Sequence, residues 1–453
     1  MKTLVIAEKP SVARDIARVL GCAKKENGAL EGNQYIVTWA LGHLVTLKDP
    51  EDYDKKYKEW NMAVLPMMPE KLQIKVIPQT GKQYHAVTTQ LARKDVGEVV
   101  IATDAGREGE LVARWILDKA HNQKPCKRLW ISSVTDKAIR EGFASLKDAK
   151  EYDNLYRAAV SRAEADWLVG INATRALTCK YNAQLSCGRV QTPTLAMIAQ
   201  REQEIREFVP KPYYTVTAAA GGAVYTWKDE KSGGTRISDP EKAKQIAEKA
   251  KRYPLVLQKV EKKKKQKEAP LLYDLTELQR DASARFGYSA KQTLNLMQSL
   301  YETHKVLTYP RTDSRYLTKD IIPTLKERLD AVSIGPYKTL AQQAKRRPLK
   351  EKPGFVNDAK VSDHHAIIPT EQYVQLSALS NEERRIYDLV VRRFLAVLLP
   401  PCVYEETVIQ ASIEKECFTA RGKRMVEKGW QEAYEDNRYD DEDETKEEVR
   451  EQN

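Results

Sequence analysis

The sequence predicts a multidomain α/β protein whose later domains are mainly helical or β-rich, and three observations support this fold class. With 453 residues the chain is too long for one hydrophobic core, because single cores stop growing at about 250–300 residues. Strand–loop–helix units occur twice in the first third of the chain, which is typical of a parallel α/β domain. The later segments lose this alternation, since 151–208 reads as helical throughout and 213–260 becomes β-like and irregular.

The two strand–loop–helix units share one plan. In the first unit the apolar run KTLVIA (2–7) precedes apolar residues at helical spacing over 11–20. In the second unit a strand over 99–102 is followed by the loop TDAGREGE and by a helix over 111–119. The repetition predicts two parallel strands of one sheet, each followed by a helix.

Elements in the rest of the chain are predicted from periodicity and turn signals: helices over 274–285, 289–301 and 381–399, a short strand KVLTYP over 305–310, and strands over 403–420. Helix, turn, helix and strand in this order resemble small DNA-handling domains, although many folds share the pattern. The lysine-rich segment 259–270 is either a charged linker or an exposed strand edge.

The charge of the chain is unevenly distributed. The net charge is +11, yet the residues from Glu432 onward hold 11 acids and 3 bases, so the preceding chain carries +19. A basic body of this kind favours a polyanion such as nucleic acid, and the acidic tail 432–453 is predicted to be disordered. A basic protein that charge merely keeps soluble is the alternative.

Two classes are disfavoured. No window reaches 18 apolar residues, so no membrane span is predicted. The six cysteines show no C-x₂-C pairing and read as reduced intracellular thiols rather than as a zinc site or a disulfide framework.

Acidic residues follow both predicted strands of the α/β domain. Glu8 comes after the first strand, and Asp104, Glu108 and Glu110 come after the second. Because ligands collect at the carboxyl ends of parallel strands, the two loops are expected to converge. Grouped carboxylates suit Mg²⁺, which takes one or two protein carboxylates and keeps several waters, and the glycines of the loop would let it approach a phosphate. The alternative is a solvated turn.

Tyr309 lies in the segment LTYPRTDS, where a packing role is the ordinary expectation. Arg311 stands two residues further on, so the two side chains can share one face of a strand. A nearby guanidinium favours the phenolate and can also clamp a phosphate. Both effects are what a tyrosine nucleophile attacking a phosphodiester requires.

The segment DHH (363–365) offers two histidines next to an aspartate. A metal fragment is one interpretation, but no third ligand follows at a suitable spacing. The alternatives are a structural role, or a phosphate contact or proton relay by one of the histidines.

Candidate nucleic-acid contacts lie in two places. The segment SCGRVQT combines a turn at Gly188, the cation Arg189 and the start of a helix, which together make an anion site, unless this is an ordinary loop. Trp60, Trp167 and Arg175 could stack on bases and contact phosphates of a single strand. Burial in a core is the alternative for both tryptophans.

Taken together, the motifs resemble the type IA DNA topoisomerase family, and most closely its bacterial topoisomerase III branch. Six segments occur in the family's order: AEKPSVA (7–13), LGHL (41–44), TDAGREGE (103–110), SCGRVQTP (186–193), TYPRTDS (308–314) and DHHAIIPT (363–370). Each segment alone is weak evidence, but their combination is specific and spans nearly the whole chain to about residue 430.

The resemblance implies a domain plan: a Toprim α/β domain over 1–150, the start of a helical DNA-binding base over 151–212, a β-rich arch over 213–270 and 401–431, a helix-turn-helix-like domain with the nucleophile over 271–400, and the acidic tail. It also implies the roles of the site residues: Tyr309 as nucleophile, Glu8 and Asp104 as Mg²⁺ ligands, Lys9 and Arg311 as phosphate-stabilising cations, and Glu8 and His364 as further catalytic groups.

The resemblance further implies a single-strand DNA path lined by Trp60, Trp167, Arg175, Ser186, Cys187, Gly188, Arg189, Val190, Gln191 and Arg311. The implied substrate is single-stranded or negatively supercoiled DNA, cut through a 5′-phosphotyrosine ester and resealed without ATP. A monomer in the bacterial cytoplasm, associated with the nucleoid, away from membranes and with a helicase as candidate partner, completes this expectation.

Two departures from the family pattern stand out. Many members have Asp-x-Asp in the acidic loop, whereas here the second position is Gly106, so weaker Mg²⁺ binding and a single ion are expected. The chain also ends before a TxPPxRYT-like segment, which suggests truncation and leaves strand passage open. The alternatives are a Toprim-type nuclease or primase-like enzyme, and a single-strand DNA-binding fragment.

Overall fold

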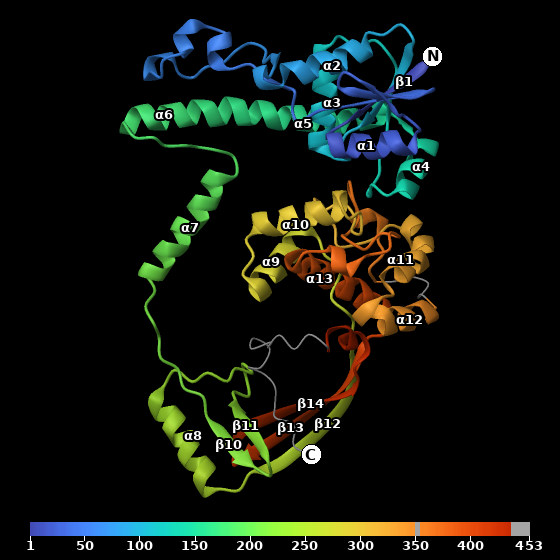
Figure 1. Cartoon of the computed structure of the whole chain (residues 1–453). Coiled ribbons are helices and arrows are strands. Elements are labelled where there is room, and N and C mark those ends of the chain that lie inside the picture. Colours follow the sequence, from blue (N-terminus) through green and yellow to red (C-terminus); the bar gives the residue numbers. More distant parts are fainter. Residues whose placement is uncertain (349–353, 436–453) are drawn as a thin grey trace.

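The computed structural model describes residues 1–348 and 354–435, and its chain runs round a ring (Figure 1). An α/β domain lies at one end, and a long helix leads from it to the single helix α7 (Gln191–Arg206). A β-sheet domain follows at the opposite end of the ring. Strand β12 (Val256–Lys267) returns from it to a helical domain, which contacts the α/β domain. This helical domain carries Tyr309, and we call it the tyrosine domain.

The α/β domain is built on a seven-stranded sheet of order β2-β3-β4-β1-β7-β8-β9. The central strands β4, β1, β7 and β8 are parallel, and β1 pairs with β7 so that Ala7 lies opposite Ala102. Its elements are β1 (Lys2–Ala7), α1 (Pro10–Val19), β2 (Lys24–Glu26), β3 (Ala29–Glu31), β4 (Tyr35–Trp39), α2 (Gly81–Leu91), β7 (Val96–Ala102), α3 (Arg107–Lys119), β8 (Cys126–Arg128), α4 (Asp136–Ala144) and β9 (Lys147–Asp148), beside a two-stranded pair, β5 (Val45–Leu47) and β6 (Ile74–Val76). The predicted strand–loop–helix units are confirmed.

Each face of this sheet has its own core. Leu4 and Ile6 of β1 point into a core shared with α2 and α3, whereas Val5 and Ala7 point into a core shared with α1 and α4. This alternation is the two-residue period of a strand buried on both faces. Tyr309 from the tyrosine domain belongs to the second core, so the two domains pack together there.

The long helix comprises α5 (Asp153–Ala165), one π-helical segment over Asp166–Ile171, and α6 (Asn172–Tyr181). Helix α7 follows after a loop, and every one of its residues is exposed. The predicted helical character of 151–208 is therefore confirmed apart from the loop.

The β-sheet domain is a five-stranded antiparallel sheet of order β10-β11-β14-β13-β12. Its elements are β10 (Thr217–Ala220), β11 (Ala223–Lys228), α8 (Pro240–Arg252), β12, β13 (Cys402–Ile413) and β14 (Glu416–Glu427). The lysine-rich segment is the edge strand β12, which decides between the two predicted alternatives. Helix α8 corrects the prediction of irregular β structure up to residue 260, and its Ala243 and Ile246 pack on the sheet.

The tyrosine domain is a helical bundle of α9 (Leu275–Phe286), α10 (Ala290–Glu302), α11 (Leu325–Val332), α12 (Lys338–Arg346) and α13 (Asn381–Leu398). The predicted strand KVLTYP is wrong as a strand: the segment is extended, but it forms only an isolated bridge between Leu307 and Pro369. The reason lies in its backbone donors, since the amide of Thr308 donates to Ile368 O and that of Tyr309 donates to Ser132 O in the other domain.

The start of the predicted acidic tail also needs correction. A 3₁₀ segment over Gly429–Tyr434 packs on α13 and buries Trp430 and Ala433. Residues 436–453 of the tail lie outside the described residues. Among the described helices, none is both long enough and apolar enough to cross a membrane.

Candidate functional site

Two carboxylates meet where neighbouring parallel strands end. Glu8 follows β1 and Asp104 follows β7 after one further residue, and the backbone amide of Asp104 donates to Glu8 Oε2 at 3.0 Å. The strand order thus brings the two predicted acidic loops together at one edge of the sheet.

The environment of this pair disfavours two negative charges. Burial, and then repulsion by Asp104, raise the pKa of Glu8 to about 7. Burial likewise raises the pKa of Asp104, against the lowering effect of Lys9. Within 1–348 and 354–435 no cluster of three or more His, Cys, Asp or Glu side chains could hold a metal. A bound Mg²⁺ would therefore rest on these two carboxylates and complete its shell with water or phosphate oxygens.

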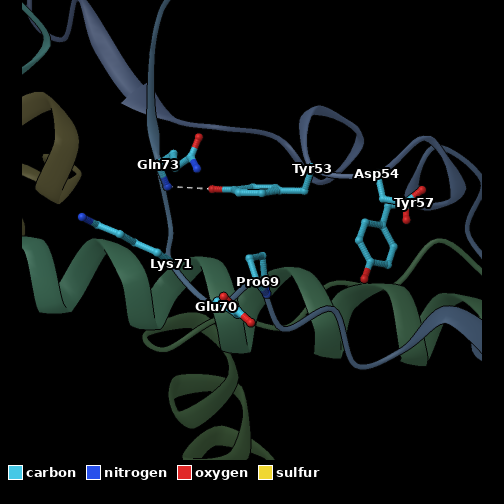
Figure 2. A pocket seen from close by; sticks show the side chains of 7 residues that line it. All are labelled: Tyr53, Asp54, Tyr57, Pro69, Glu70, Lys71 and Gln73. Carbon is cyan, nitrogen blue, oxygen red and sulfur yellow. Dashed lines mark hydrogen bonds between the residues drawn. The ribbon is translucent and has the colours of Figure 1, made fainter.

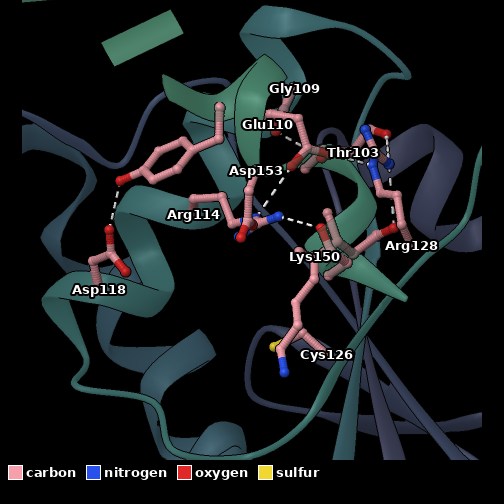
Figure 3. A network of polar contacts seen from close by, with 12 residues as sticks. Thr103, Gly109, Glu110, Arg114, Asp118, Cys126, Arg128, Lys150 and Asp153 are labelled. Atoms are coloured by element: carbon pink, nitrogen blue, oxygen red, sulfur yellow. Dashed lines mark hydrogen bonds and ion pairs between the residues drawn. The ribbon is translucent and has the colours of Figure 1, made fainter. Parts of the chain in front are cut away.

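The other acids of the loop have different partners. Glu108 is on the surface, where its carboxylate contacts His43 Nε2 at 2.6 Å and accepts from Arg162 Nη2 at 2.7 Å. Glu110 is fully buried and receives Arg128 Nε at 2.5 Å and Arg114 Nε at 3.2 Å. Figure 3 shows Glu110 lying between these two guanidinium groups. Neither acid is available to a cation at the strand ends.

Arg128 is the residue that shapes the acidic loop. Its guanidinium is fully buried and donates to the carbonyls of Thr103 and Asp104, both at 2.7 Å, and of Leu129 at 2.9 Å. With Glu110 it forms a neutral buried unit whose remaining donors satisfy the backbone of the loop. This network fixes the direction in which the loop leaves β7.

The two loop glycines differ in what they allow. A Cβ on Gly109 would stand 1.8 Å from the carbonyl oxygen of Asp104, so the helix start and the loop pack too closely for any side chain. Gly106 has an extended backbone that any residue can adopt, and a Cβ there would meet nothing within 4 Å. The missing carboxylate of the family pattern would therefore fit at position 106.

Tyr309 is buried against this site. Its ring centroid lies 4.3 Å from that of His364 and 5.4 Å from that of Tyr301. Burial, followed by the charges of Asp104 and Glu8, raises the pKa of Tyr309 well above its usual value. Arg311 acts in the opposite direction but does not outweigh these effects, so the predicted phenolate is not the resting form.

His364 connects the two domains next to Tyr309. Its Nε2 contacts the carbonyl oxygen of Ala105, which can only accept, so Nε2 carries the proton. Burial lowers the pKa of His364 to about 4, so the ring is neutral and Nδ1 accepts from Ser132 Oγ at 2.9 Å. His365 is buried elsewhere and contacts Ala366 O at 2.7 Å, so the two histidines do not form a metal fragment.

The two predicted phosphate-binding cations differ in their partners. Lys9 Nζ donates to Glu302 Oε1 at 2.5 Å, across the junction of the two domains. Arg311 is exposed and makes no hydrogen bond or ion pair with the part of the chain that the structure describes. Sequence reasoning missed Glu302, whose only signal was its place at the end of the helix that precedes TYPR.

The predicted single-strand contacts fall into exposed and buried groups. Trp60 is 49% exposed, and the guanidinium of the buried Arg175 lies 5.2 Å from its ring centroid. Nε of Arg175 has no hydrogen-bond partner among the described residues. Trp167 is buried and its indole N–H donates to Lys48 O at 2.9 Å, so its ring packs in the protein.

A hollow of about 400 Å³ lies near Trp60, in the loops that precede β6. Figure 2 shows Tyr53, Tyr57, Pro69 and Lys71 around it, and the Tyr53 hydroxyl accepts from the backbone N–H of Gln73 at 2.8 Å. The carbonyl oxygen of Tyr57 accepts from Arg175, so this hollow adjoins the predicted DNA path. Sequence reasoning had not found it.

The segment SCGRVQ is the loop that leads into α7, and only its last residue, Gln191, belongs to the helix. Ser186, Arg189, Val190 and Gln191 are exposed, while Cys187 and Gly188 are half-buried. Arg189 Nε donates to Asp166 Oδ1 at 2.9 Å, and the amide of Cys187 donates to Thr174 Oγ1 at 2.9 Å. Both bonds attach the segment to the long helix.

The fold and the site define a ring-shaped multidomain protein in which the acidic strand ends of an α/β domain meet a buried tyrosine of a helical domain. A family model described as DNA topoisomerase matches residues 150–453, and a Toprim domain model matches residues 3–134. The chain therefore belongs to the type IA DNA topoisomerase family.

Similar proteins agree with this assignment. The chain is 60% identical over 443 residues to DNA topoisomerase 3 of Bacillus subtilis (strain 168), covering 98% of this chain and 61% of that protein. It is 60% identical over 452 residues to DNA topoisomerase 3 of Bacillus anthracis, covering 100% of this chain and 62% of the relative. The chain thus spans about three fifths of the length of these curated relatives.

A solved structure has the same fold. The full-length topoisomerase I from Thermotoga maritima superposes with a TM-score of 0.71 at 23% sequence identity, over 95% of this chain and 67% of the other. The predicted fold class, a Toprim domain followed by the core of a type IA topoisomerase, is confirmed.

Proposed function

We propose that this chain acts as a type IA DNA topoisomerase that cuts one DNA strand through Tyr309, lets another segment pass and reseals the break. In the cutting step the Tyr309 oxygen attacks phosphorus, and the bond from phosphorus to the 3′-oxygen of the adjoining sugar breaks. The tyrosine proton ends on that oxygen as a 3′-hydroxyl, and a 5′-phosphotyrosine ester remains. Resealing reverses these bonds, so ATP is not needed.

Mg²⁺ is the proposed cofactor, held by Glu8 and Asp104. The pair fits a divalent cation because burial and mutual repulsion leave its negative charge uncompensated. When bound, the ion would supply positive charge beside the phosphate. Among the described residues no third His, Cys, Asp or Glu side chain is placed to hold a metal together with these two, which favours one ion rather than two.

Residues of the chain itself would stabilise the charge on the phosphate and position Tyr309. Lys9 and Arg311 supply positive charge for the phosphate, and Arg311 also favours loss of the Tyr309 proton. Neutral His364 bonds to Ser132 and the Ala105 carbonyl of the α/β domain and packs its ring on that of Tyr309, so it positions the tyrosine against that domain.

The proposed DNA path runs from this junction over the long helix to Trp60 and the start of α7. Exposed Trp60 suits base stacking, and exposed Arg189 suits a phosphate. Buried Arg175 and Trp167 support the path from beneath. The same proposal includes the predicted domain boundaries and single-stranded or negatively supercoiled DNA as substrate. It also includes a monomeric state, a helicase partner and a location in the bacterial cytoplasm at the nucleoid.

One observation carries the proposal: Tyr309 shares a hydrophobic core with β1, more than 300 residues earlier in the chain, and so lies beside the strand-end acids. Denaturing the protein with a labelled single-stranded oligonucleotide and Mg²⁺ should trap a covalent adduct. Tyr309→Phe should abolish the adduct, and Tyr301→Phe, which alters a neighbouring buried tyrosine, should keep it.

Two results would contradict the proposal. An adduct in the Tyr309→Phe protein would mean that another residue is the nucleophile. DNA fragments with free ends and no protein attached would instead identify a Toprim-type nuclease.

A further inference from the structure

The ion pair between Lys9 and Glu302 joins the two domains at the site itself. Lys9 is the last residue before α1 in the α/β domain, and Glu302 is the last residue of α10 in the tyrosine domain. Their side chains are 34% and 15% exposed, and Gln298, one turn earlier on α10, donates to the same oxygen of Glu302. The pair is therefore a partly buried contact that α10 holds in place.

Glu302 faces the same space as the strand-end acids. Its neighbour Tyr301 packs edge-on against the ring of Tyr309. The charge of Glu302 is close enough to help raise the pKa of both Asp104 and Tyr309. Three carboxylates thus surround the position where a phosphate would meet Tyr309. One of them, Glu302, is paired with Lys9, the cation that is expected to contact the phosphate.

A phosphate cannot join Lys9 while Glu302 keeps its present position without a repulsive contact between like charges. We propose that Glu302 holds Lys9 while DNA is absent and releases it to the phosphate that Tyr309 attacks, so that this ion pair is a latch between the domains that DNA opens. This inference rests on the proposed function, because it takes the reacting phosphate as the group that displaces Glu302.

Two other ion pairs across the same junction do not involve a cation that is expected to bind the phosphate. Lys305 pairs with Asp15 at 2.6 Å, and Lys137 pairs with Glu327 at 2.5 Å. Neither lysine is among the predicted phosphate-binding cations, and breaking either pair frees no cation of the site. They serve as internal controls for a general loosening of the junction.

The latch predicts the direction of a binding change. In a Tyr309→Phe background, which prevents cutting, Glu302→Gln should tighten binding of a fluorescent single-stranded oligonucleotide by about two- to fivefold, the range for a partly exposed ion pair. Asp15→Asn should leave the affinity unchanged. With Lys9→Ala also present, Glu302→Gln should tighten binding clearly less, because the cation that it frees is gone and only the repulsion between Glu302 and the phosphate is removed.

Equal or weaker binding by Glu302→Gln would overturn the latch, and so would tightening that keeps its full size in the Lys9→Ala background. Glu302→Ala should reproduce the tightening, so that the result does not depend on one amide side chain. In the protein with Tyr309, the oligonucleotide concentration for half-maximal adduct should fall by the same factor. Failure to form any adduct would overturn the proposed function. The latch is tested separately, by the oligonucleotide affinities in the Tyr309→Phe background.

Discussion

The α/β domain buries acids in two opposite environments, one at Glu110 and one at the pair of Glu8 and Asp104. Glu110 is fully buried but paired with buried Arg128, whose other donors are taken up by backbone carbonyls. Glu8 and Asp104 are buried beside each other, and burial raises the pKa of both. The first group is neutral as a unit, whereas the second lacks a fixed counter-charge.

The contrast separates stability from function within one loop. A buried charge with a well-bonded partner gives a specific structure, and a buried charge without one either takes up a proton or binds a cation. The sequence TDAGREGE contains both kinds, because Glu110 builds the frame on which Asp104 is presented.

The largest effect is expected for Glu110→Gln. The change leaves the Arg128 guanidinium buried without its counter-charge, which costs about 3–5 kcal/mol when one partner of such a pair is removed. The free energy of unfolding from denaturant titration should fall accordingly. Glu108→Gln, two residues away on the surface, should cost less than about 1 kcal/mol. Similar losses for both variants would refute the division.

Two histidines of the tyrosine domain, His364 and His365, extend the same comparison, because both are buried, neither forms an ion pair with an acid of the described chain, and both remain neutral. Burial lowers the pKa of His364 and of His365 to about 4. As the pH falls below about 6.5, these histidines bind protons in the unfolded chain but not yet in the folded chain. The free energy of unfolding therefore decreases between about pH 6.5 and 4. The loss at pH 5 should be on the order of 1–2 kcal/mol for each histidine.

The measurement is the free energy of unfolding at pH 7 and pH 5 for the parent and for His365→Gln. Burial is the largest influence on the pKa of His365, and neither Glu8 nor Asp104 is among the groups that shift it, so the variant tests burial apart from the acids of the site. The free energy of unfolding of the variant should change less steeply with pH than that of the parent. The difference in slope should correspond to at most one bound proton. An unchanged slope would show that His365 is not held neutral.

Much of this arrangement follows from local pattern. The strands before Glu8 and Asp104 are short apolar runs followed by helices, so their parallel pairing, and with it the meeting of the two acids, could be predicted from the sequence. The burial of Trp167 could only be named as one alternative, since a tryptophan in a helix serves packing and stacking equally well.

Contacts between distant segments could not be predicted in this way. Lys9 and Glu302 are 293 residues apart, and nothing in the local sequence of either residue names the other. The partner of Glu110 lies on β8, so its structural role was equally hidden. Helix α8 is a different failure, because Asp239 and Pro240 are a recognisable helix start that the surrounding β-like residues obscured.

The smallest expected effect concerns Gly106, the position at which this loop lacks the second aspartate of the family pattern. Its backbone is extended and a Cβ would meet nothing within 4 Å, so Gly106→Asp adds a carboxylate beside the uncompensated pair without a clash. Because ligand charge tunes the affinity of such sites, Mg²⁺ should bind roughly threefold to tenfold more tightly, as measured by calorimetric titration. Gly106→Asn has nearly the same shape without the charge and should stay near the parent affinity. If both variants tightened equally, backbone restriction rather than charge would be the cause, and if neither did, the cation would not lie beside this loop.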